Sequence, residues 1–380
     1  DIDQAQAPIF RAMTLDPELS EVQYTMGLYY WARRRPEAIE AFARAIELNP
    51  NNADALEHYG HALWHRQDSA GDPEYFQRAL AVDPLTLSRH AALGDFYAKD
   101  GQVEETLEVI DRIQGLCVND RSTRKLEAYR AIESLLQQIG KIDEAIAWTI
   151  RARDLEPGED DHVDRLAGLY AEIGDYDTAL EVNTDAGVGI LLRMRRYQDL
   201  IDKAELLMID RPGDAIVAYL LAFGHNAVGS YEDALYVLAT TDQPNVVLDN
   251  TVRTPFDVDA FFSVVNASYA IGELETARQL AQRHYDGADR NPGIATNWWY
   301  FFNISCALAI LGREDEAIEA LGKLENSPQI PWEPYLRDAV CMKLLEDRPE
   351  HQQILEHVEL RKRELREKLP TTLARFGVSL

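Results

Sequence analysis

The chain has 380 residues, of which 46% are hydrophobic and 27% are charged, and its formal net charge at pH 7 is −27. The composition is ordinary for a folded protein. The acidic excess argues against direct contact with nucleic acid or with an anionic membrane, because both require a basic surface. It favours a basic or cationic partner, although a role in solubility alone would also explain it.

No secretory signal is visible at the N-terminus. The most apolar stretch, residues 298–311, is too short to span a bilayer, so it predicts a buried helix and no membrane insertion. The cysteines lie far apart and form no CxxC motif, which predicts reduced thiols and a cytoplasmic protein. They are Cys117, Cys306 and Cys341.

One position recurs along the chain at intervals of 34 residues. The interval separates Ala145 from Ala179, and it resumes between Leu200 and Ala234. In the N-terminal part, the same position is held by Ala38, Asp72 and Thr106. A 34-residue period with two helices per unit is typical of the tetratricopeptide repeat, which the chain resembles over nearly its whole length.

The first full unit carries the pattern most clearly. Its characteristic residues are Met26, Gly27, Tyr30, Ala38, Phe42, Ala45 and Pro50. Small residues at 27 and 38 are expected where the two helices of a unit cross closely, with the aromatic rings at 30 and 42 filling the space beside them. Pro50 ends the second helix, because proline cannot continue a helix.

The pattern predicts an all-α fold, a right-handed superhelical solenoid of about nine helix-turn-helix units with a helical C-terminal cap. The predicted segments are a partial repeat made of a second helix only (1–17), an N-terminal array (18–186), a C-terminal array (187–330) with a loop insertion (241–257), and the cap (331–380). Because the chain starts inside a unit, we expect the natural protein to continue upstream. A lone capping helix at the start is the alternative, and a helix face left unpaired there would favour a homodimer.

Two irregular regions lie in the second half. Residues 185–190 are predicted to join a shortened second helix to a shortened first helix. Residues 335–369 indicate two helices. The last of them, at 352–368, alternates Glu with Lys or Arg and is expected to end at Pro370.

The C-terminal half carries a narrower resemblance. The tract Asn297-Trp298-Trp299, the tract Pro331-Trp332 followed by Leu336-Arg337-Asp338, and the ending at 369–377 occur together. They are similar to the repeat region that follows an output domain in bacterial regulators. The resemblance implies a regulatory region downstream of a winged-helix DNA-binding domain or a nucleotide cyclase, neither of which lies in this segment.

No catalytic or cofactor motif is present in the sequence. The chain has no P-loop, no HExxH and no nucleophile elbow, so we expect neither an enzyme nor a bound cofactor. His58, His61 and His65 follow one another at helical spacing, and imidazoles one turn apart can chelate zinc or nickel. Polar residues are nevertheless expected on this helix face in a solenoid, so we predict a solvated or peptide-contacting face and no metal.

The first helices of the units line the concave surface of a tetratricopeptide solenoid, and this surface is the expected binding site. Its N-terminal candidates are Tyr24, Trp31, Asp54, Glu57, His58, His61 and His65. Its C-terminal candidates are Tyr219, Asn226, Phe262, Asn266, Tyr269, Trp299, Phe302 and Asn303. Aromatic rings provide contact area, and asparagine can both donate to and accept from a peptide backbone.

The predicted ligand is a protein or peptide, with a small-molecule effector in the aromatic and asparagine groove of the C-terminal repeats as the alternative. The sequence leaves open whether the chain's own tail or loop fills that groove.

Overall fold

The computed structural model describes residues 2–33, 35–64, 73–117, 122–212, 214–239, 255–288 and 298–380. The chain divides into two compact units. Unit 1 comprises Asp1–Ala131 and Asn291–Gly293, and unit 2 comprises Ile132–Arg290 and Ile294–Leu380. Every regular element in the described ranges is a helix, which confirms the all-α fold. The predicted boundary at residue 186 stays a prediction.

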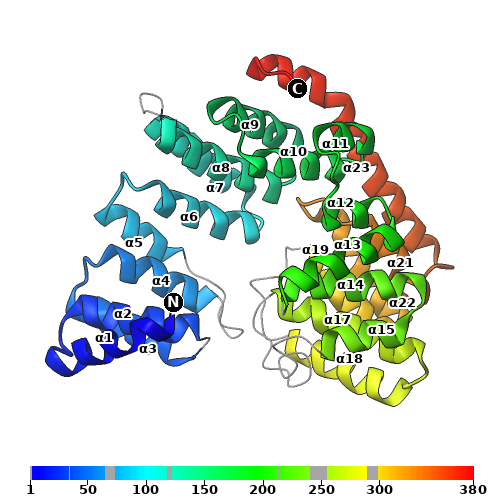
Figure 1. The fold of residues 1–380 in the computed structure, drawn as a ribbon, viewed down its shortest axis with the longest axis horizontal. Helices are drawn as coiled ribbons and strands as arrows, with labels where there is room; N and C mark the ends of the chain where they lie inside the picture. The colour runs from blue at the N-terminus through cyan, green and yellow to red at the C-terminus, as the bar shows by residue number, and fades with distance from the viewer. Residues whose placement is uncertain are drawn as a thin grey trace. The chain divides into compact units, whose positions relative to one another are not determined.

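Unit 1 is a succession of helices of 9 to 17 residues (Figure 1). These helices are α1 (Ile2–Leu15), α2 (Ser20–Ala32), α3 (Glu37–Leu48), α4 (Ala53–Trp64), α5 (Glu74–Val82), α6 (Leu87–Lys99), α7 (Val103–Cys117) and the start of α8 (Ser122–Gln138). Helices α2 and α3, α4 and α5, and α6 and α7 pack as pairs, as a helix-turn-helix repeat requires.

The close crossing predicted at Gly27 is present in the α2–α3 pair. A Cβ atom at Gly27 would lie 2.4 Å from the Phe42 ring, whose side chain is fully buried. In the next pair, a Cβ atom at Gly60 would lie 3.1 Å from the Phe76 ring. Glycine at these positions allows the second helix to place an aromatic ring directly against the first helix.

We expect Gly27→Ala to destabilise unit 1 by about 1–2 kcal/mol, because overpacking of the Phe42 ring outweighs the better helix propensity of alanine. Gly115→Ala in α7 is the matched control, since nothing lies within 4 Å of its added Cβ atom. The control should be neutral or slightly stabilising. Denaturant unfolding of both variants tests this, and equal stabilities would contradict the close crossing.

Unit 2 contains the rest of α8, which is followed by α9 (Ile142–Leu155). The next helices follow in pairs: α10 (Asp160–Glu172) with α11 (Tyr176–Val182), α12 (Val188–Arg193) with α13 (Tyr197–Asp210), α14 (Ala215–Val228) with α15 (Tyr231–Ala239), α17 (Pro255–Ala270) with α18 (Leu274–Ala288), and α19 (Trp298–Ile310) with α20 (Glu314–Gly322). With α8 and α9 counted as a pair by their order in the sequence, the described helices give nine successive two-helix units, which agrees with the prediction of about nine. Helix α19 is largely buried, also as predicted.

The shortened helices expected around residues 185–190 are α11 and α12, which have 7 and 6 residues. Most of the predicted insertion, residues 241–254, lies outside the described residues. Its last three positions are helical, because α17 begins at Pro255.

After α20, the chain forms η2 (Lys323–Asn326), α21 (Glu333–Asp338), α22 (Val340–Lys343) and α23 (Pro349–Phe376). Helix α23 packs against α9, α20 and η2. In the part of the chain that the structure describes, no helix is both long and apolar enough to cross a membrane.

The prediction that the last helix ends at Pro370 is wrong. Helix α23 runs through Pro370 to Phe376. Proline removes one backbone hydrogen bond, but tertiary contacts hold the final turns. Thr372 donates a 2.5 Å hydrogen bond to the fully buried carboxylate of Asp143, and Lys368 lies 2.9 Å from the same carboxylate. Arg151 donates to the Phe376 carbonyl at 2.8 Å.

Candidate functional site

The face of unit 1 formed by the first helices of its pairs combines aromatic rings with acidic groups. We define the unit-1 face by the predicted residues that the structure describes: Tyr24, Trp31, Asp54, Glu57, His58 and His61. They lie on α2 and α4, and their side chains are partly exposed. His65 lies outside the described residues. Whether the unit-1 face binds a partner stays a prediction.

Arg89 of α6 organises the carboxylates of the unit-1 face. Its guanidinium donates to Asp54 and to Glu57, each at 2.7 Å, and it lies 3.4 Å from Asp83. The Arg89 residue is 8% exposed, whereas the side chain of Asp54 is 60% exposed. Three carboxylates around one cation leave a net negative charge that is directed partly to solvent.

Arg89 was not among the residues predicted from sequence, although its position in the repeat indicates the pairing. Arg89 follows Asp54 by 35 residues and Glu57 by 32 residues, which is close to one repeat period. Side chains one period apart lie on adjacent first helices, so an acid and a base at this spacing indicate an ion pair between neighbouring units.

Tyr24 and His58 form the aromatic part of the unit-1 face. Their rings meet edge to face at 5.4 Å, and the Tyr24 hydroxyl lies 3.5 Å from His58 Nδ1. Burial, together with the negative charges of Asp54 and Glu57, raises the pKa of Tyr24 to about 12. Tyr24 therefore keeps its proton at neutral pH.

The two described histidines of the predicted cluster, His58 and His61, contact other groups of the chain. His58 Nδ1 donates to the Asp54 carbonyl at 3.0 Å, and the His61 ring packs edge to face on Phe76 at 4.9 Å. Among the described residues, no group of three or more His, Cys, Asp or Glu side chains is placed to hold a metal ion.

Aromatic rings of unit 1 also contact cations. Lys99 Nζ lies 4.8 Å from the centre of the Trp64 ring and 2.8 Å from an Asp95 carboxylate oxygen. The Arg35 guanidinium lies over Tyr30 at 5.1 Å. In both contacts, the cation lies where the face of the aromatic ring attracts positive charge.

In unit 2, most of the predicted residues are buried inside the chain. We define the unit-2 face as the first-helix side chains Tyr219, Phe223, Asn226, Phe262, Asn266, Trp299, Phe302 and Asn303 of α14, α17 and α19. All of them except the partly exposed Trp299 are at most 5% exposed. Tyr269 is partly exposed.

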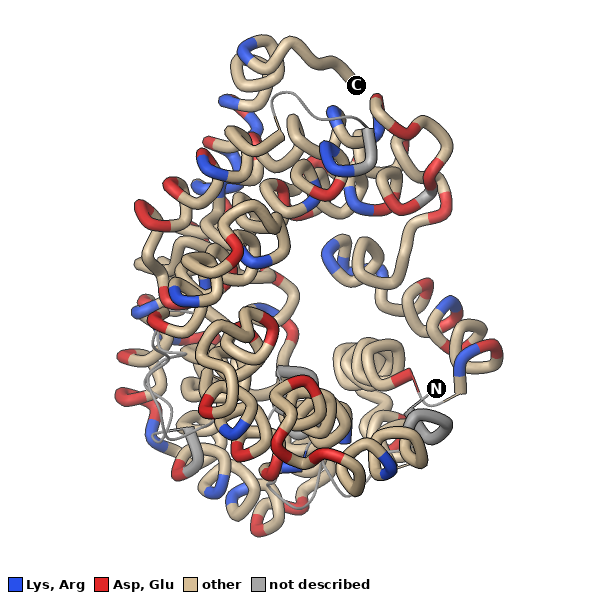
Figure 2. The backbone as a smooth tube through the Cα atoms, turned by 90° about the vertical axis from the view of Figure 1, so that its left-hand side faces the viewer, with Lys and Arg blue, Asp and Glu red and all other residues tan. Residues whose placement is uncertain are grey.

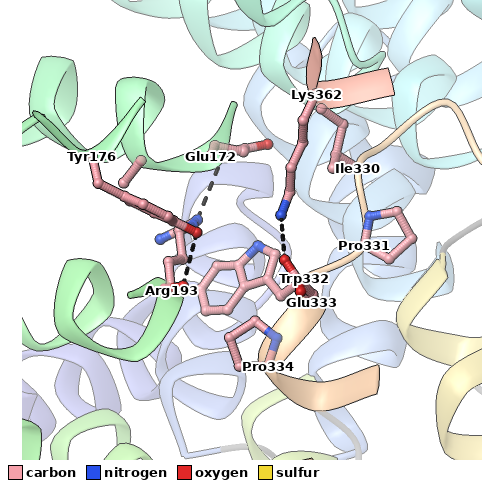
Figure 3. A pocket seen from close by; sticks show the side chains of 10 residues that line it. Glu172, Tyr176, Arg193, Ile330, Pro331, Trp332, Glu333, Pro334 and Lys362 are labelled. Atoms are coloured by element: carbon pink, nitrogen blue, oxygen red, sulfur yellow. Dashed lines mark hydrogen bonds and ion pairs between the residues drawn. The ribbon is translucent and has the colours of Figure 1, made fainter. Parts of the chain in front are cut away.

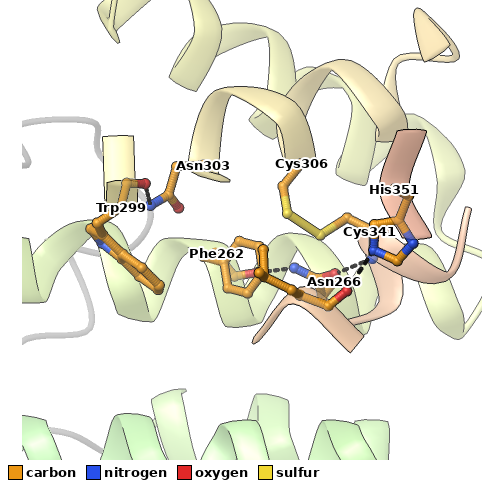
Figure 4. Close-up of a disulfide and its surroundings, with 8 residues drawn as sticks. Phe262, Asn266, Trp299, Asn303, Cys306, Cys341 and His351 are labelled. Carbon is orange, nitrogen blue, oxygen red and sulfur yellow. Dashed lines mark hydrogen bonds between the residues drawn. A yellow bond between two sulfur atoms is a disulfide. The ribbon is translucent and has the colours of Figure 1, made fainter. Parts of the chain in front are cut away.

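The asparagines of the unit-2 face bind the chain's own backbone. Asn226 donates to the Ser263 carbonyl at 3.1 Å, and Asn303 donates to the Trp299 carbonyl at 2.7 Å. Asn266 donates to the Phe262 carbonyl at 2.8 Å and accepts from the Cys341 backbone N–H at 2.7 Å (Figure 4). The bond between Asn266 and Cys341 joins the face to a segment outside the repeats. An external ligand that binds Asn266 would have to replace this bond.

Tyr335 of α21 occupies the aromatic centre of the unit-2 face. Its ring is surrounded by the rings of Phe223 at 4.6 Å, Trp299 at 5.0 Å and Phe302 at 5.8 Å, with Tyr219 stacked at 6.3 Å. Tyr335 is 2% exposed as a result. The chain's own C-terminal segment therefore fills the face, an outcome that the sequence left open.

Contacts with arginine side chains hold the C-terminal segment on both sides of Tyr335. Asp338 accepts two 2.6 Å hydrogen bonds from Arg195 and one from the Tyr197 hydroxyl. On the other side, the Arg193 guanidinium lies over the Trp332 ring at 3.9 Å. Bidentate and stacked arginine contacts fix orientation as well as position.

A small cavity beside Trp332 contains buried charges (Figure 3). It is lined by Glu172, Arg193, Glu333 and Lys362, and Lys362 Nζ lies 3.0 Å from a Glu333 oxygen. Burial raises the pKa of the Glu172 carboxyl. Burial alone would lower the pKa of Lys362, but the charges of Glu333 and Glu359 and a hydrogen bond to Glu359 raise it.

The prediction of three reduced thiols is wrong for two of the cysteines. Cys306 of α19 and Cys341 of α22 form a disulfide with a Cα–Cα distance of 5.1 Å (Figure 4), and Cys117 is a buried free cysteine. No spacing of the cysteines indicates the bond, because Cys341 lies outside the repeats. Folding of α22 onto α19 and α17 brings the two cysteines together.

His351 joins α23 to α21 and makes the stability of unit 2 dependent on pH. Its Nε2 donates to the Leu336 carbonyl at 2.8 Å. Burial lowers the pKa of His351, and the Arg337 charge acts in the same direction. The folded chain therefore favours neutral His351, whereas the unfolded chain binds a proton below a pH of about 6.5.

We expect the free energy of unfolding of unit 2 to fall as the pH falls from 7 through about 6.5 towards the lowered pKa of His351. His351→Gln keeps a side-chain donor but does not titrate. The stability difference between the wild type and this variant should therefore shrink on acidification. Denaturant unfolding between pH 7 and 5 measures it, and a constant difference would contradict the assignment.

Charges are distributed along the whole described chain. Figure 2 shows Asp and Glu positions interspersed with Lys and Arg rather than gathered on one element. The unit-1 face is distinguished by the arrangement of its acids around Arg89 and beside Tyr24.

Successive helix pairs, a 34-residue period that recurs in parts of the chain and the close Gly27–Phe42 packing define an all-α array of the tetratricopeptide type. Residues 24–85, which contain the whole of the unit-1 face, match the family described as Tetratricopeptide repeat. Domains of this type generally act as non-catalytic scaffolds that bind proteins or peptides.

Among curated proteins, the chain is 24% identical over 237 residues to superkiller complex protein 3 of Mus musculus. The match covers 55% of this chain and 14% of that protein, so the chain spans about a seventh of its length.

The chain also matches solved structures, among them the P58(IPK) TPR domain and the human IFIT1 dimer with m7Gppp-AAAA. The first is 15% identical, with coverage of 97% of this chain and 94% of that chain and a TM-score of 0.24. The second is 13% identical, with coverage of 85% and 77% and a TM-score of 0.41.

Proposed function

We propose that the chain is a non-catalytic interaction module and that the unit-1 face binds a basic peptide segment of a partner protein. The observation that carries the proposal is the cluster of Asp54 and Glu57, held by Arg89 beside the partly exposed Tyr24, with the partly exposed Trp31 further along the same helix α2. Acidic groups fixed in place beside aromatic rings are suited to lysine and arginine side chains.

The charge arrangement supports a cationic rather than an anionic ligand. Arg89 is nearly buried and is already bonded to carboxylates, so it is poorly placed to bind an added anion. Asp54 is largely exposed, so an incoming cation can approach it. The contact of Lys99 with Trp64 is an example within unit 1 of the cation–ring pairing that we propose for the partner.

A panel of basic peptides tests the proposal. A peptide is first selected for binding to the full chain, and its affinity is then measured for variants by fluorescence anisotropy. We expect Asp54→Asn and Trp31→Ala each to weaken binding by about 5- to 10-fold, and Asp54→Asn also to reduce the salt dependence.

Glu105→Gln is the matched control. It removes the same charge from an exposed position on α7, the second helix of its pair. The control should bind like the wild type. Equal losses for Asp54→Asn and Glu105→Gln would mean that net charge alone attracts the peptide. No selected peptide, or insensitivity to both unit-1 substitutions, would contradict the proposal.

We also propose that the chain is the regulatory or scaffold region of a longer bacterial signalling protein. The support is the resemblance of its C-terminal half to the repeat regions of bacterial regulators, including Pro331-Trp332 and Leu336-Arg337-Asp338. The coding sequence upstream of Asp1 tests this proposal. A winged-helix or nucleotide-cyclase domain there would support it, and an unrelated enzyme domain would contradict it.

A further inference from the structure

We propose that the unit-2 face is a second peptide-binding surface, that residues 330–343 are its intramolecular ligand, and that the Cys306–Cys341 disulfide controls exchange of this segment for a partner peptide. The partner peptide would carry an indole, a phenol three residues later and a carboxylate three residues after that. This is the pattern of Trp332, Tyr335 and Asp338.

The segment contacts the unit-2 face in the way a bound peptide contacts a receptor. Tyr335 is an aromatic anchor inside a ring of aromatic side chains, and Trp332 lies under Arg193. Asp338 pairs with Arg195 and Tyr197 at the edge, where the side chain of Arg195 is 46% exposed. A buried aromatic anchor with charged pairs at the rim is the usual arrangement of a recognition interface.

The segment lacks a stable structure of its own. Helices α21 and α22 have six and four residues and are separated by Ala339 in an extended conformation. Helices this short are not stable in isolation, so the segment is held by its contacts with the repeats. Such a segment can leave the face without unfolding the helix pairs beneath it.

The disulfide is a covalent bond that keeps the segment from leaving the unit-2 face. It attaches α22 to α19, next to the hydrogen bond from the Cys341 N–H to Asn266. Both sulfurs are buried, with exposures of 3% at Cys306 and 0% at Cys341. Reduction therefore requires local opening of α22, the shortest helix of the segment.

The redox step is thiol–disulfide exchange with a dithiol. One thiolate of the dithiol attacks Cys341 Sγ, the Cys306–Cys341 bond breaks, and Cys306 leaves as a thiolate. The second thiol of the reagent then displaces Cys341 from the mixed disulfide. The two cysteines gain two electrons and two protons, and the dithiol becomes a disulfide.

A labelled peptide with the sequence of residues 328–343, carrying Cys341→Ser to prevent mixed disulfides, tests the proposal on the full chain. We expect it to bind the chain reduced with dithiothreitol at least about 10-fold more tightly than the oxidised chain. The same peptide with Tyr335→Ala should lose most of this binding. The Cys306→Ser chain should bind the peptide without reduction.

Hydrogen exchange on the wild-type chain provides a readout that needs no substitution. Reduction should accelerate exchange at residues 330–343 while α14, α17 and α19 stay protected. Four results would overturn the proposal: no peptide binding to the reduced chain, equal binding to the oxidised and reduced chains, equal binding of the Tyr335→Ala peptide, or general loss of helix on reduction.

Discussion

Tyr335→Ala should be the most damaging single substitution in unit 2, with a loss of about 3–5 kcal/mol in the free energy of unfolding. The ring is 2% exposed and lies among Phe223, Trp299 and Phe302, so truncation leaves a cavity at the centre of the unit-2 face. Denaturant unfolding followed by circular dichroism measures the loss.

Tyr335→Phe is the matched control for this prediction. It keeps the ring and removes only the hydroxyl, so we expect a loss of about 1 kcal/mol. A similar small loss for Tyr335→Ala would show that the ring is not packed as described and would contradict the occupied state of the unit-2 face.

Gly140→Ala should be the second most damaging substitution, with a loss of about 3 kcal/mol, because two separate costs add. Gly140 has a φ of +74°, which costs an alanine about 1–2 kcal/mol. Its Cβ atom would also lie 1.9 Å from the Pro328 carbonyl oxygen, and overpacking of this kind costs about 1–3 kcal/mol. Pro328 lies between η2 and α21, so the substitution also tests how residues 327–332 dock on the α8–α9 turn.

Gly229→Ala separates the two costs. Gly229 ends α14 with a φ of +86°, and nothing lies within 4 Å of an added Cβ atom. It should lose only the conformational part, about 1–2 kcal/mol. Thermal unfolding of both variants compares them, and equal losses would argue against the contact between Gly140 and Pro328.

The repeat architecture could be predicted from sequence because it is encoded locally. The 34-residue period, the small residue at Gly27 and the ring at Phe42 each act within one helix pair. The burial of α19 follows in the same way from its apolar run. These features require no knowledge of contacts between distant segments.

Features that depend on distant contacts could not be predicted. Tyr335 packs on Tyr219 and Phe223, which lie more than 100 residues earlier in the chain. Helix α23 continues past Pro370 because Asp143, more than 200 residues away, binds Thr372. The disulfide also depends on the docking of α22. Arg89 is different, since the repeat period itself points to its pairing with Asp54.

The two faces have different solvent access in this structure, and the proposed function depends on that difference. The unit-1 face has partly exposed aromatic rings, whereas Tyr335 covers the unit-2 face. Oxidative footprinting by hydroxyl radicals, with mass spectrometry of the full chain, measures both faces in one experiment.

We predict strong oxidation of Tyr24 and Trp31, weak oxidation of Tyr335 and Phe302, and protection of the first pair alone when a selected basic peptide is added. Strong radical modification of Tyr335 in the chain with its disulfide intact would contradict the occupied unit-2 face. Protection of Tyr24 and Trp31 before any peptide is added would contradict the open unit-1 face.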